Sequence, residues 1–430
     1  MNVLIVGNGA REHALGWKLR QSPRLTDLFV APGNAGTALV ATNLDINPMD
    51  FEGIARVCVE RRVELVVIGP EDPLAAGLVD FLQERGIAAY GPAKAAAQIE
   101  ASKAFAKDLM RRAGIPTAES RVFDSVAEAV GFAESWADRT GMPPVVKADG
   151  LAAGKGVTVA ADVEEARRAI EAALNDGAFG AAGSRLVLEE RMTGRETSAQ
   201  AFTDGVTVVP MAYACDYKRV FDGDAGPNTG GMGVYSPPGF VDDVLQDEIR
   251  RTIIEPTVRA LAEGGAPYTG TLYPGLMITD AGPRVVEYNC RFGDPETQAL
   301  MLRLESDLLE IMLAVNEGRL AEAEIRWKDN AVVGVVVASG GYPGAYQTGY
   351  PIEGLDALDD GVQVFHAGTR RDGDRIVTAG GRVLTVVASG GTLAEARERV
   401  YDNVARLHFP GMHYRHDIAL RELLPAHDSA

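Results

Sequence analysis

The first hundred residues alternate short apolar runs with longer amphipathic segments. Runs rich in Val, Leu and Ile that end at Gly or Pro are typical of buried strands. The pattern predicts strands at 2–6, 28–30, 64–68 and 88–90, with helices at about 11–20 and 74–85. Strands alternating with helices form a doubly wound parallel sheet, which binds ligands at the carboxyl ends of its strands. Two turns fall at that edge, Gly7-Asn8-Gly9 and the 69–73 turn that contains Glu71.

The next hundred residues change pattern. Ser125 with Glu128, and Asp162 with Glu165, have the spacing of capping boxes, and each precedes an amphipathic helix. Between the two helices, the Val-rich ends of 143–160 predict two strands joined by a Gly-rich loop at 148–156. With a further strand at 185–190, these elements predict a small α+β unit over about 123–192. A small unit with a Gly-rich tip suits a lid over an active site.

A polar face on one strand is the main candidate for chemistry. Alternation over 284–291 places Val285, Glu287, Asn289 and Arg291 on the same face, just before the turn at Asp294. A carboxylate and an amide oxygen suit Mg²⁺, which takes one or two carboxylates plus substrate oxygens. The alternative is an edge strand with a solvated polar face.

The preceding 216–233 segment is too rich in glycine for a regular element, and 295–317 is predicted to be one helix.

The last hundred residues predict a separate mixed domain. Apolar runs at 332–338 and 384–388 indicate strands, and Thr392 with Glu395 caps a helix that ends near 407. The chain therefore divides into an N-terminal domain (1–101), a central domain (102–325) and a C-terminal domain (326–430). The predicted fold class is multidomain α/β and α+β.

Composition narrows the classes of function. The 430 residues include 60 acidic against 42 basic side chains, for a formal net charge of -18. That balance argues against broad binding to nucleic acid or to an anionic membrane. The three scattered cysteines lack metal-ligand spacing and predict free thiols in a reducing compartment. Without a signal-peptide pattern or a run long enough to span a bilayer, we expect a cytoplasmic protein, and a monomer.

Several residues have the chemistry of a nucleotide site. Lys147 ends a predicted strand and Lys155 lies in the Gly-rich loop after it, where an ammonium suits a phosphate. There is no P-loop motif. The first turn begins as a dinucleotide fingerprint, but Glu12 stands where its third glycine belongs, so a dinucleotide is disfavoured.

Seven segments together resemble the ATP-grasp ligases, and within them the phosphoribosylamine–glycine ligase family. They are VGNGAREHAL (6–15), APGNAGT (31–37), GPEDPLAAG (69–77), SKAFAKDLM (102–110), KADGLAAGKGV (147–157), GPNTGGMG (226–233) and EYNCRFGDPETQ (287–298). The resemblance covers nearly the whole chain. The chain departs from the family pattern at Tyr217, Pro274 and Arg195, which puts fine substrate geometry in question.

The resemblance implies an ATP-dependent ligase that joins glycine to 5-phosphoribosylamine through an acyl phosphate, with Mg²⁺ or Mn²⁺. It implies catalytic roles for Lys147, Arg291 and Asp294, and metal ligation by Glu287 and Asn289. The residues that it implies for ATP are Lys103, Lys147, Lys155, Glu189, Arg191 and Glu196, with Lys107 a weaker candidate than Lys103. Those that it implies for the other substrates are Gly7, Asn8, Gly9, Glu71, Asp216, Arg291 and Asp294. Two alternatives stay open: an ATP-grasp ligase for another acid and amine, and a non-catalytic nucleotide-binding relative.

Overall fold

The computed structural model describes residues 1–151, 156–175 and 180–424. Its N-terminal part is a five-stranded, all-parallel sheet in the order β3-β2-β1-β4-β5. The strands are β1 (Asn2–Gly7), β2 (Asp27–Pro32), β3 (Thr42–Asn43), β4 (Leu65–Ile68) and β5 (Ala89–Tyr90). The helices are α1 (Ala10–Leu19), α2 (Thr37–Val40), α3 (Phe51–Glu60), α4 (Glu71–Ala76), α5 (Leu78–Gln83) and α6 (Lys94–Ala101). The predicted doubly wound sheet is confirmed, and its two Gly-containing turns follow the neighbouring strands β1 and β4.

One predicted helix of this part is wrong. The expected 74–85 helix is divided into α4 and α5 at Gly77, whose φ of +100° lies in the left-handed region. A residue with a side chain rarely adopts that conformation, so the break depends on glycine. The helix also begins earlier than predicted, because Glu71 opens α4.

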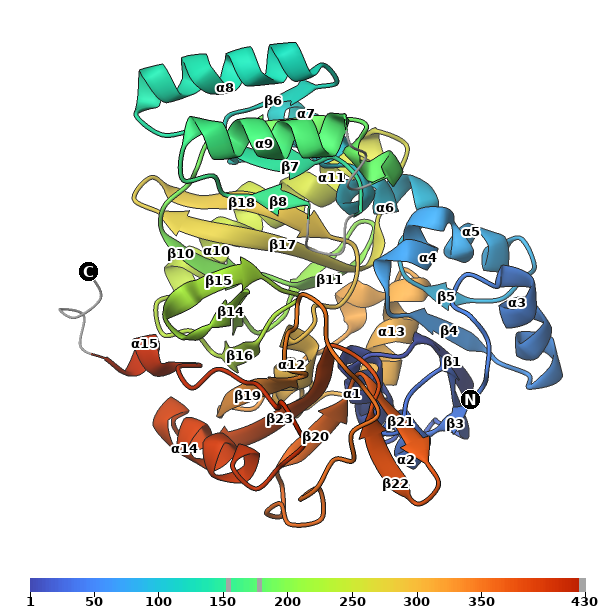
Figure 1. The fold of residues 1–430 in the computed structure, drawn as a ribbon. Helices are drawn as coiled ribbons and strands as arrows, with labels where there is room; N and C mark the ends of the chain where they lie inside the picture. The colour runs from blue at the N-terminus through green and yellow to red at the C-terminus, as the bar shows by residue number, and fades with distance from the viewer. Residues whose placement is uncertain (152–155, 176–179, 425–430) are drawn as a thin grey trace.

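The predicted α+β unit forms one end of the molecule (Figure 1). It is an antiparallel sheet in the order β6-β9-β7-β8, covered by two helices that pack on each other. Its elements are β6 (Ser120–Phe123), α8 (Val126–Thr140), β7 (Val145–Ala148), β8 (Val157–Thr158), α9 (Val163–Leu174) and β9 (Leu186–Glu189). Ala133, Ile170 and Leu188 belong to a core of its own. The predicted capping bond from Asp162 to the Glu165 N–H is present at 2.8 Å, whereas Ser125 makes no side-chain capping bond.

A second antiparallel sheet is built along the long strand β17 (Thr269–Thr279). β10 (Arg195–Ser198) and β11 (Ala201–Asp204) pair along one side of β17, and β18 (Gly282–Asn289) pairs along the other. β12 (Val208–Pro210) extends the sheet beyond β11. The helices of this part are α7 (Lys103–Ala113), α10 (Asp243–Ile249), α11 (Glu255–Glu263), α12 (Glu296–Arg303) and α13 (Leu308–Asn316). The predicted single helix over 295–317 is therefore two helices.

The C-terminal sheet takes two strands from the central part of the chain. β13 (Cys215–Asp216) and β16 (Gly233–Ser236) continue the order β13-β16-β19-β23-β20, with β16 paired to β19. The C-terminal strands are β19 (Ala331–Ala338), β20 (Gln363–His366), β21 (Thr369–Asp372), β22 (Arg375–Thr378) and β23 (Arg382–Gly390), and the helices are α14 (Leu393–Val404) and α15 (Leu420–Leu423). The glycine-rich 216–233 segment also holds a hairpin of β14 (Arg219–Phe221) and β15 (Ala225–Asn228), so the expectation that it contains no regular element is wrong.

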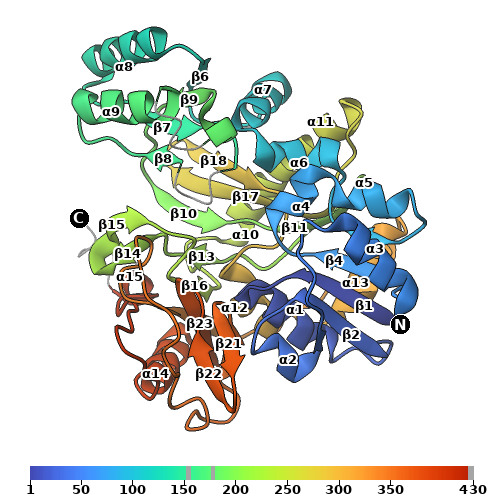
Figure 2. The same cartoon turned by 45° about the vertical axis from the view of Figure 1, so that its right-hand side comes forward.

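The N-terminal and C-terminal parts meet directly (Figure 2), where α1 packs against β20. The backbone N–H of His366 donates to Nδ1 of His13 at 2.9 Å. Both imidazoles are buried. Burial lowers the pKa of His13 to about 3, with His366 acting in the same direction, and burial lowers the pKa of His366 to about 4. Both rings are therefore neutral near pH 7 in the folded protein.

Candidate active site

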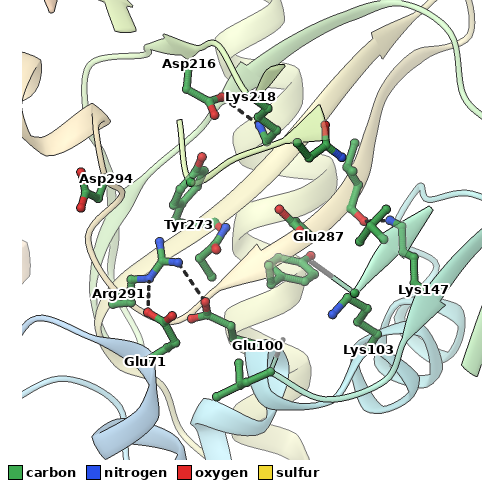
Figure 3. A pocket seen from close by; sticks show the side chains of 18 of the residues that line it. Glu71, Glu100, Lys103, Lys147, Asp216, Lys218, Tyr273, Glu287, Arg291 and Asp294 are labelled. Carbon is green, nitrogen blue, oxygen red and sulfur yellow. Dashed lines mark hydrogen bonds and ion pairs between the residues drawn. The ribbon is translucent and has the colours of Figure 1, made fainter. Parts of the chain in front are cut away.

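A cavity of about 500 Å³ lies where all these parts converge. Its wall takes Glu71 and Glu100 from the N-terminal part, Lys147 from the small unit, Glu287 from β18 and Arg382 from the C-terminal sheet. In Figure 3, Lys103, Lys147 and Glu287 lie on one side of the cavity and Asp294 on the opposite side. Asp216 with Lys218, and Arg291 with the two N-terminal glutamates, occupy the wall between them.

The polar strand presents its side chains to this cavity through a bulge. The register of β18 against β17 shifts so that Gly275 pairs with Glu287 and Leu276 with Val285, which leaves Val286 as the extra residue. Glu287, Asn289 and Arg291 line the cavity, as predicted. Val285 does not share their face; it is fully buried in the core with Tyr288 and Cys290. Simple alternation misplaced it because it cannot detect a bulge.

Arg291 is held by two carboxylates of the N-terminal part. Its guanidinium lies 3.2 Å from Glu71 and 3.1 Å from Glu100. Burial would raise the pKa of Glu71, but Arg291 and then Arg11 outweigh it and hold the pKa at about 2. For Glu100 burial dominates and its pKa is raised despite Arg291. Glu100 was not foreseen, because it lies within the helix α6 and no motif marks it.

Glu189 lies between two lysines at the end of β9. It forms ion pairs with Lys147 and with Lys107, the latter at 2.7 Å, and all three side chains are buried. Burial acts to raise the pKa of Glu189, but the two lysines outweigh it and lower that pKa. Lys147 also donates to the Val286 carbonyl oxygen at 3.2 Å. The Glu189 carboxylate is therefore engaged with two lysines of the protein.

Two charged side chains of the cavity wall, Glu287 and Lys103, form no ion pair with another described residue. Among the described residues, the Glu287 carboxylate accepts no hydrogen bond and forms no ion pair, and Lys103 has no carboxylate partner. In the described ranges, the Lys103 ammonium donates to the Gly150 carbonyl oxygen at 3.4 Å. Burial lowers the pKa of Lys103, and the negative charge of Glu287 opposes that shift without forming an ion pair. A free carboxylate and a free ammonium on one side of a cavity match a ligand that carries both cations and phosphates.

The same side fits a divalent cation. Asn289 uses its Nδ2 atom to donate to the Tyr273 carbonyl oxygen at 3.5 Å, so its Oδ1 atom is available beside Glu287. Within the described ranges no group of three or more His, Cys, Asp and Glu side chains could enclose a metal. One carboxylate and one amide oxygen suit Mg²⁺, because that ion commonly takes its remaining ligands from water and substrate phosphates.

Lys218 was overlooked by the sequence reasoning. It lies 2.9 Å from Asp216 and 3.2 Å from Glu196 and so joins two predicted residues. Burial raises the pKa of Asp216 to about 6, with Lys218 opposing and Glu296 reinforcing the shift. Asp216 and Lys218 line the cavity, whereas Glu196 does not. Lys218 follows Asp216 by two residues, which puts both side chains on the same face of an extended segment. That spacing could have indicated from the sequence that Lys218 belongs to the site.

Other predicted residues are not brought to the cavity wall. The first turn is filled by Glu12, whose carboxylate accepts from the Gly9 N–H at 2.6 Å, and Gly7, Asn8 and Gly9 do not line the cavity. Arg191 is exposed and away from the wall. Lys155 lies outside the described residues. None of the three departures from the family pattern lines the cavity: Tyr217 packs under Arg415, Arg195 pairs with Glu422, and Pro274 is buried in β17.

The comparisons with known proteins extend over nearly the whole chain, 97% and 98% of it in the two relatives described below. Residues 1–100, 101–297 and 332–421 match, in order, the N domain, the ATP-grasp (A) domain and the C domain of phosphoribosylglycinamide synthetase. The chain is 50% identical over 419 residues to a phosphoribosylamine–glycine ligase of Mesorhizobium japonicum, covering 97% of each chain. It is 49% identical over 427 residues to that of Vibrio vulnificus, covering 98% of this chain and 99% of the relative.

Comparison with solved structures supports the same family. The phosphoribosylamine–glycine ligase of Thermotoga maritima superposes with a TM-score of 0.84 at 33% identity, covering 97% of this chain and 100% of that one. The biotin carboxylase domain of a Hydrogenobacter thermophilus 2-oxoglutarate carboxylase superposes with a TM-score of 0.74 at 18% identity, covering 96% and 91%. At 18% identity, the similarity to the biotin carboxylase domain shows a shared fold and nothing about function.

Proposed function

This chain belongs to the phosphoribosylglycinamide synthetase family, and on that premise we propose that its central cavity is the active site of a phosphoribosylamine–glycine ligase. The enzyme joins glycine to 5-phosphoribosylamine and converts ATP to ADP and phosphate, giving glycinamide ribonucleotide for purine biosynthesis. The observation that carries the assignment of the site is the free pair on one side of the cavity, Lys103 and Glu287. On the opposite side of the cavity Asp294 is paired with Arg382, and we assign that side to glycine and phosphoribosylamine.

Phosphoryl transfer requires mainly alignment and charge neutralisation from the protein. Lys103 and Lys147 bind the ATP phosphates, and Glu287 and Asn289 hold Mg²⁺ or Mn²⁺, which neutralises phosphate charge when bound. Lys147 keeps its ammonium oriented through Glu189, while Lys103 is free to contact phosphate. We assign the adenine end of ATP to the Glu189 side of the cavity. The family resemblance also implies contacts to ribose and adenine for Arg191 and Glu196, which do not line the cavity, and a phosphate contact for Lys155.

The reaction has two steps. A glycine carboxylate oxygen attacks the γ-phosphorus and ADP leaves, which forms glycyl phosphate. The amine of phosphoribosylamine then attacks the glycyl carbon, loses a proton and expels phosphate, which forms the amide bond. Asp216, Arg291 and Asp294 orient the two substrates, with Glu71 and the first turn of the N-terminal part on the phosphoribosylamine side. An acyl phosphate hydrolyses in water, so the small 123–192 unit serves as a lid.

The broader assignments follow the same premise. No helix in the described part of the chain has the length and apolar character needed to cross a membrane. We place the enzyme in the cytoplasm as a monomer with domains at 1–101, 102–325 and 326–430. Its three cysteines are buried free thiols, which agrees with a reducing compartment.

Product identification is the decisive experiment. The protein is incubated with ATP, Mg²⁺, glycine and freshly made phosphoribosylamine, and the products are analysed by mass spectrometry. We expect glycinamide ribonucleotide and an equal amount of ADP. ADP without the amide, or an amide only with another amino acid, would refute the assignment, and no phosphate release under any condition would indicate a non-catalytic relative.

A further inference from the structure

Arg382 connects the C-terminal sheet to two separate loops of the cavity. It opens β23, yet its Nη1 atom donates to the carbonyl oxygens of Gly230 at 2.6 Å and Asp294 at 3.1 Å. Its Nη2 atom donates to Oδ2 of Asp294 at 2.9 Å. The planar guanidinium thus fixes both the backbone and the side chain of Asp294, a geometry that a lysine ammonium cannot reproduce.

The two loops that Arg382 joins also touch each other closely. A Cβ on Gly231 would lie 2.4 Å from the Pro295 ring, and the φ of Gly231 is +111°. A Cβ on Gly230 would lie 3.1 Å from the guanidinium carbon of Arg382. Glycine at both positions therefore permits the loop at 228–231 to lie against the loop at 293–295, with Arg382 bonded to both.

A second residue of the C-terminal part acts on the same loop. The hydroxyl of Tyr342 accepts from the Gly230 N–H at 3.1 Å. Gly230 is exposed, but its N–H and its C=O are both taken by C-terminal side chains, and Tyr342 and Arg382 both line the cavity. An exposed glycine loop has little to order it otherwise, because glycine loses more conformational freedom than any other residue when it is fixed.

The loop at 291–295 is consequently held from two directions. Arg291 is bound by Glu71 and Glu100 of the N-terminal part, and Asp294 is bound by Arg382 of the C-terminal part. Figure 3 shows Lys103, Lys147 and Glu287 across the cavity from Asp294, the residue that Arg382 binds. We therefore expect the contacts proposed for ATP to be insensitive to the loss of Arg382.

We propose that Arg382, assisted by Tyr342, is a positioning residue for the acid and amine substrates: it sets Asp294 and Gly230 from the C-terminal part, so that this side of the cavity forms only against that part. The inference rests on the proposed function. It gives the C-terminal part a role in ligation that is separable from nucleotide binding.

The test compares substrates within one variant. In Arg382→Ala we expect the KM for glycine or for phosphoribosylamine to rise at least about tenfold, while the Kd of a non-hydrolysable ATP analogue, measured by calorimetry, changes less than about twofold. Arg382→Lys should fall between Arg382→Ala and the wild type, because it keeps the charge but loses the fork. Tyr342→Phe should shift the same KM in the same direction by a smaller factor.

Arg406→Ala is the matched control. Arg406 is a C-terminal arginine paired with Asp359 on the surface, and its loss should leave all constants unchanged. Unchanged KM for both glycine and phosphoribosylamine in Arg382→Ala overturns the inference, as does an equal weakening of the ATP analogue. If Arg382→Ala does not fold, Arg382→Lys and Tyr342→Phe decide in the same way.

The two possible failures are distinguishable. A wild-type protein that makes no glycinamide ribonucleotide overturns the proposed function and this inference with it. A wild-type protein that ligates, together with variants of unchanged KM, overturns the inference alone.

Discussion

Lys103 and Lys107 are four residues apart on α7, one helical turn, yet within the described chain only Lys107 has a carboxylate partner, Glu189 at 2.7 Å. The same helix therefore presents one ammonium bound within the protein and one left for a ligand. The two positions make a matched pair for mutation, because their substitution should separate stability from substrate binding.

Replacing Lys103 with Met should raise the KM for ATP at least about tenfold, a loss of about 1.4 kcal/mol. The melting temperature without nucleotide should not fall, because no buried carboxylate loses its partner. Lys107→Met should instead cost about 1–3 kcal/mol of unfolding free energy, since it removes a charged hydrogen-bonding partner from buried Glu189. Steady-state kinetics and thermal unfolding of both variants test this; a reversed pattern would contradict the assignment.

Glu287→Gln removes the free carboxylate while keeping its size. We expect turnover to fall at least about 100-fold, as for loss of a main electrostatic contribution, with little change in melting temperature. Asp280→Asn, at the exposed turn of the same β17–β18 hairpin, is the control and should keep full activity. Turnover near the wild-type rate at saturating Mg²⁺ would rule out Glu287 as a metal ligand.

Stability should fall in acid through His13. Its folded pKa of about 3 lies below the ordinary 6.5, so the unfolded chain binds the proton first. The stabilisation is complete above about pH 6.5 and is lost as the pH falls toward 3. His13→Gln keeps an acceptor for the His366 N–H and removes one titrating group, so its melting temperature should depend less on pH between 6 and 4.5. His408→Gln, at an exposed histidine, is the control variant. A slope in His13→Gln equal to that of the wild type would show that His13 does not contribute.

ADP release should depend on the second substrate. With ATP, Mg²⁺ and glycine alone we expect slow release, and phosphoribosylamine should raise it at least about tenfold, a coupling of roughly 1.4 kcal/mol. The reason is that Arg291 ties the cavity to the N-terminal part, where phosphoribosylamine is expected to bind and to drive closure. Omitting each substrate in turn measures the effect. Full-rate release with glycine alone would refute the coupling but leave the ligase in place.

Local patterns were enough to predict the parts of the site that lie close in sequence. Alternation over 284–291 placed Glu287, Asn289 and Arg291 together, and the motif lysines Lys103 and Lys147 both line the cavity. The parallel sheet followed from strands that alternate with helices. These features depend on neighbouring residues, which a single sequence displays.

The missed features depend on distant residues or on single backbone angles. Arg382 meets Asp294 across 88 positions and Glu100 meets Arg291 across 191, and nothing near either residue announces its partner. The bulge at Val286 arises from the register with β17, which periodicity does not encode. Gly77 divides a helix only because it adopts a positive φ, whereas an isolated glycine elsewhere can continue one.

The shared C-terminal sheet also constrains how the chain is made. β16 gains its partner β19 only after residues 332–335 have left the ribosome, about a hundred positions after β16 itself. Until then Val234 and Tyr235 belong to a strand with one open edge, and such an edge invites pairing with other chains. Translation that stalls between the two strands would leave a nascent chain prone to aggregate, even though its parallel N-terminal sheet is already complete.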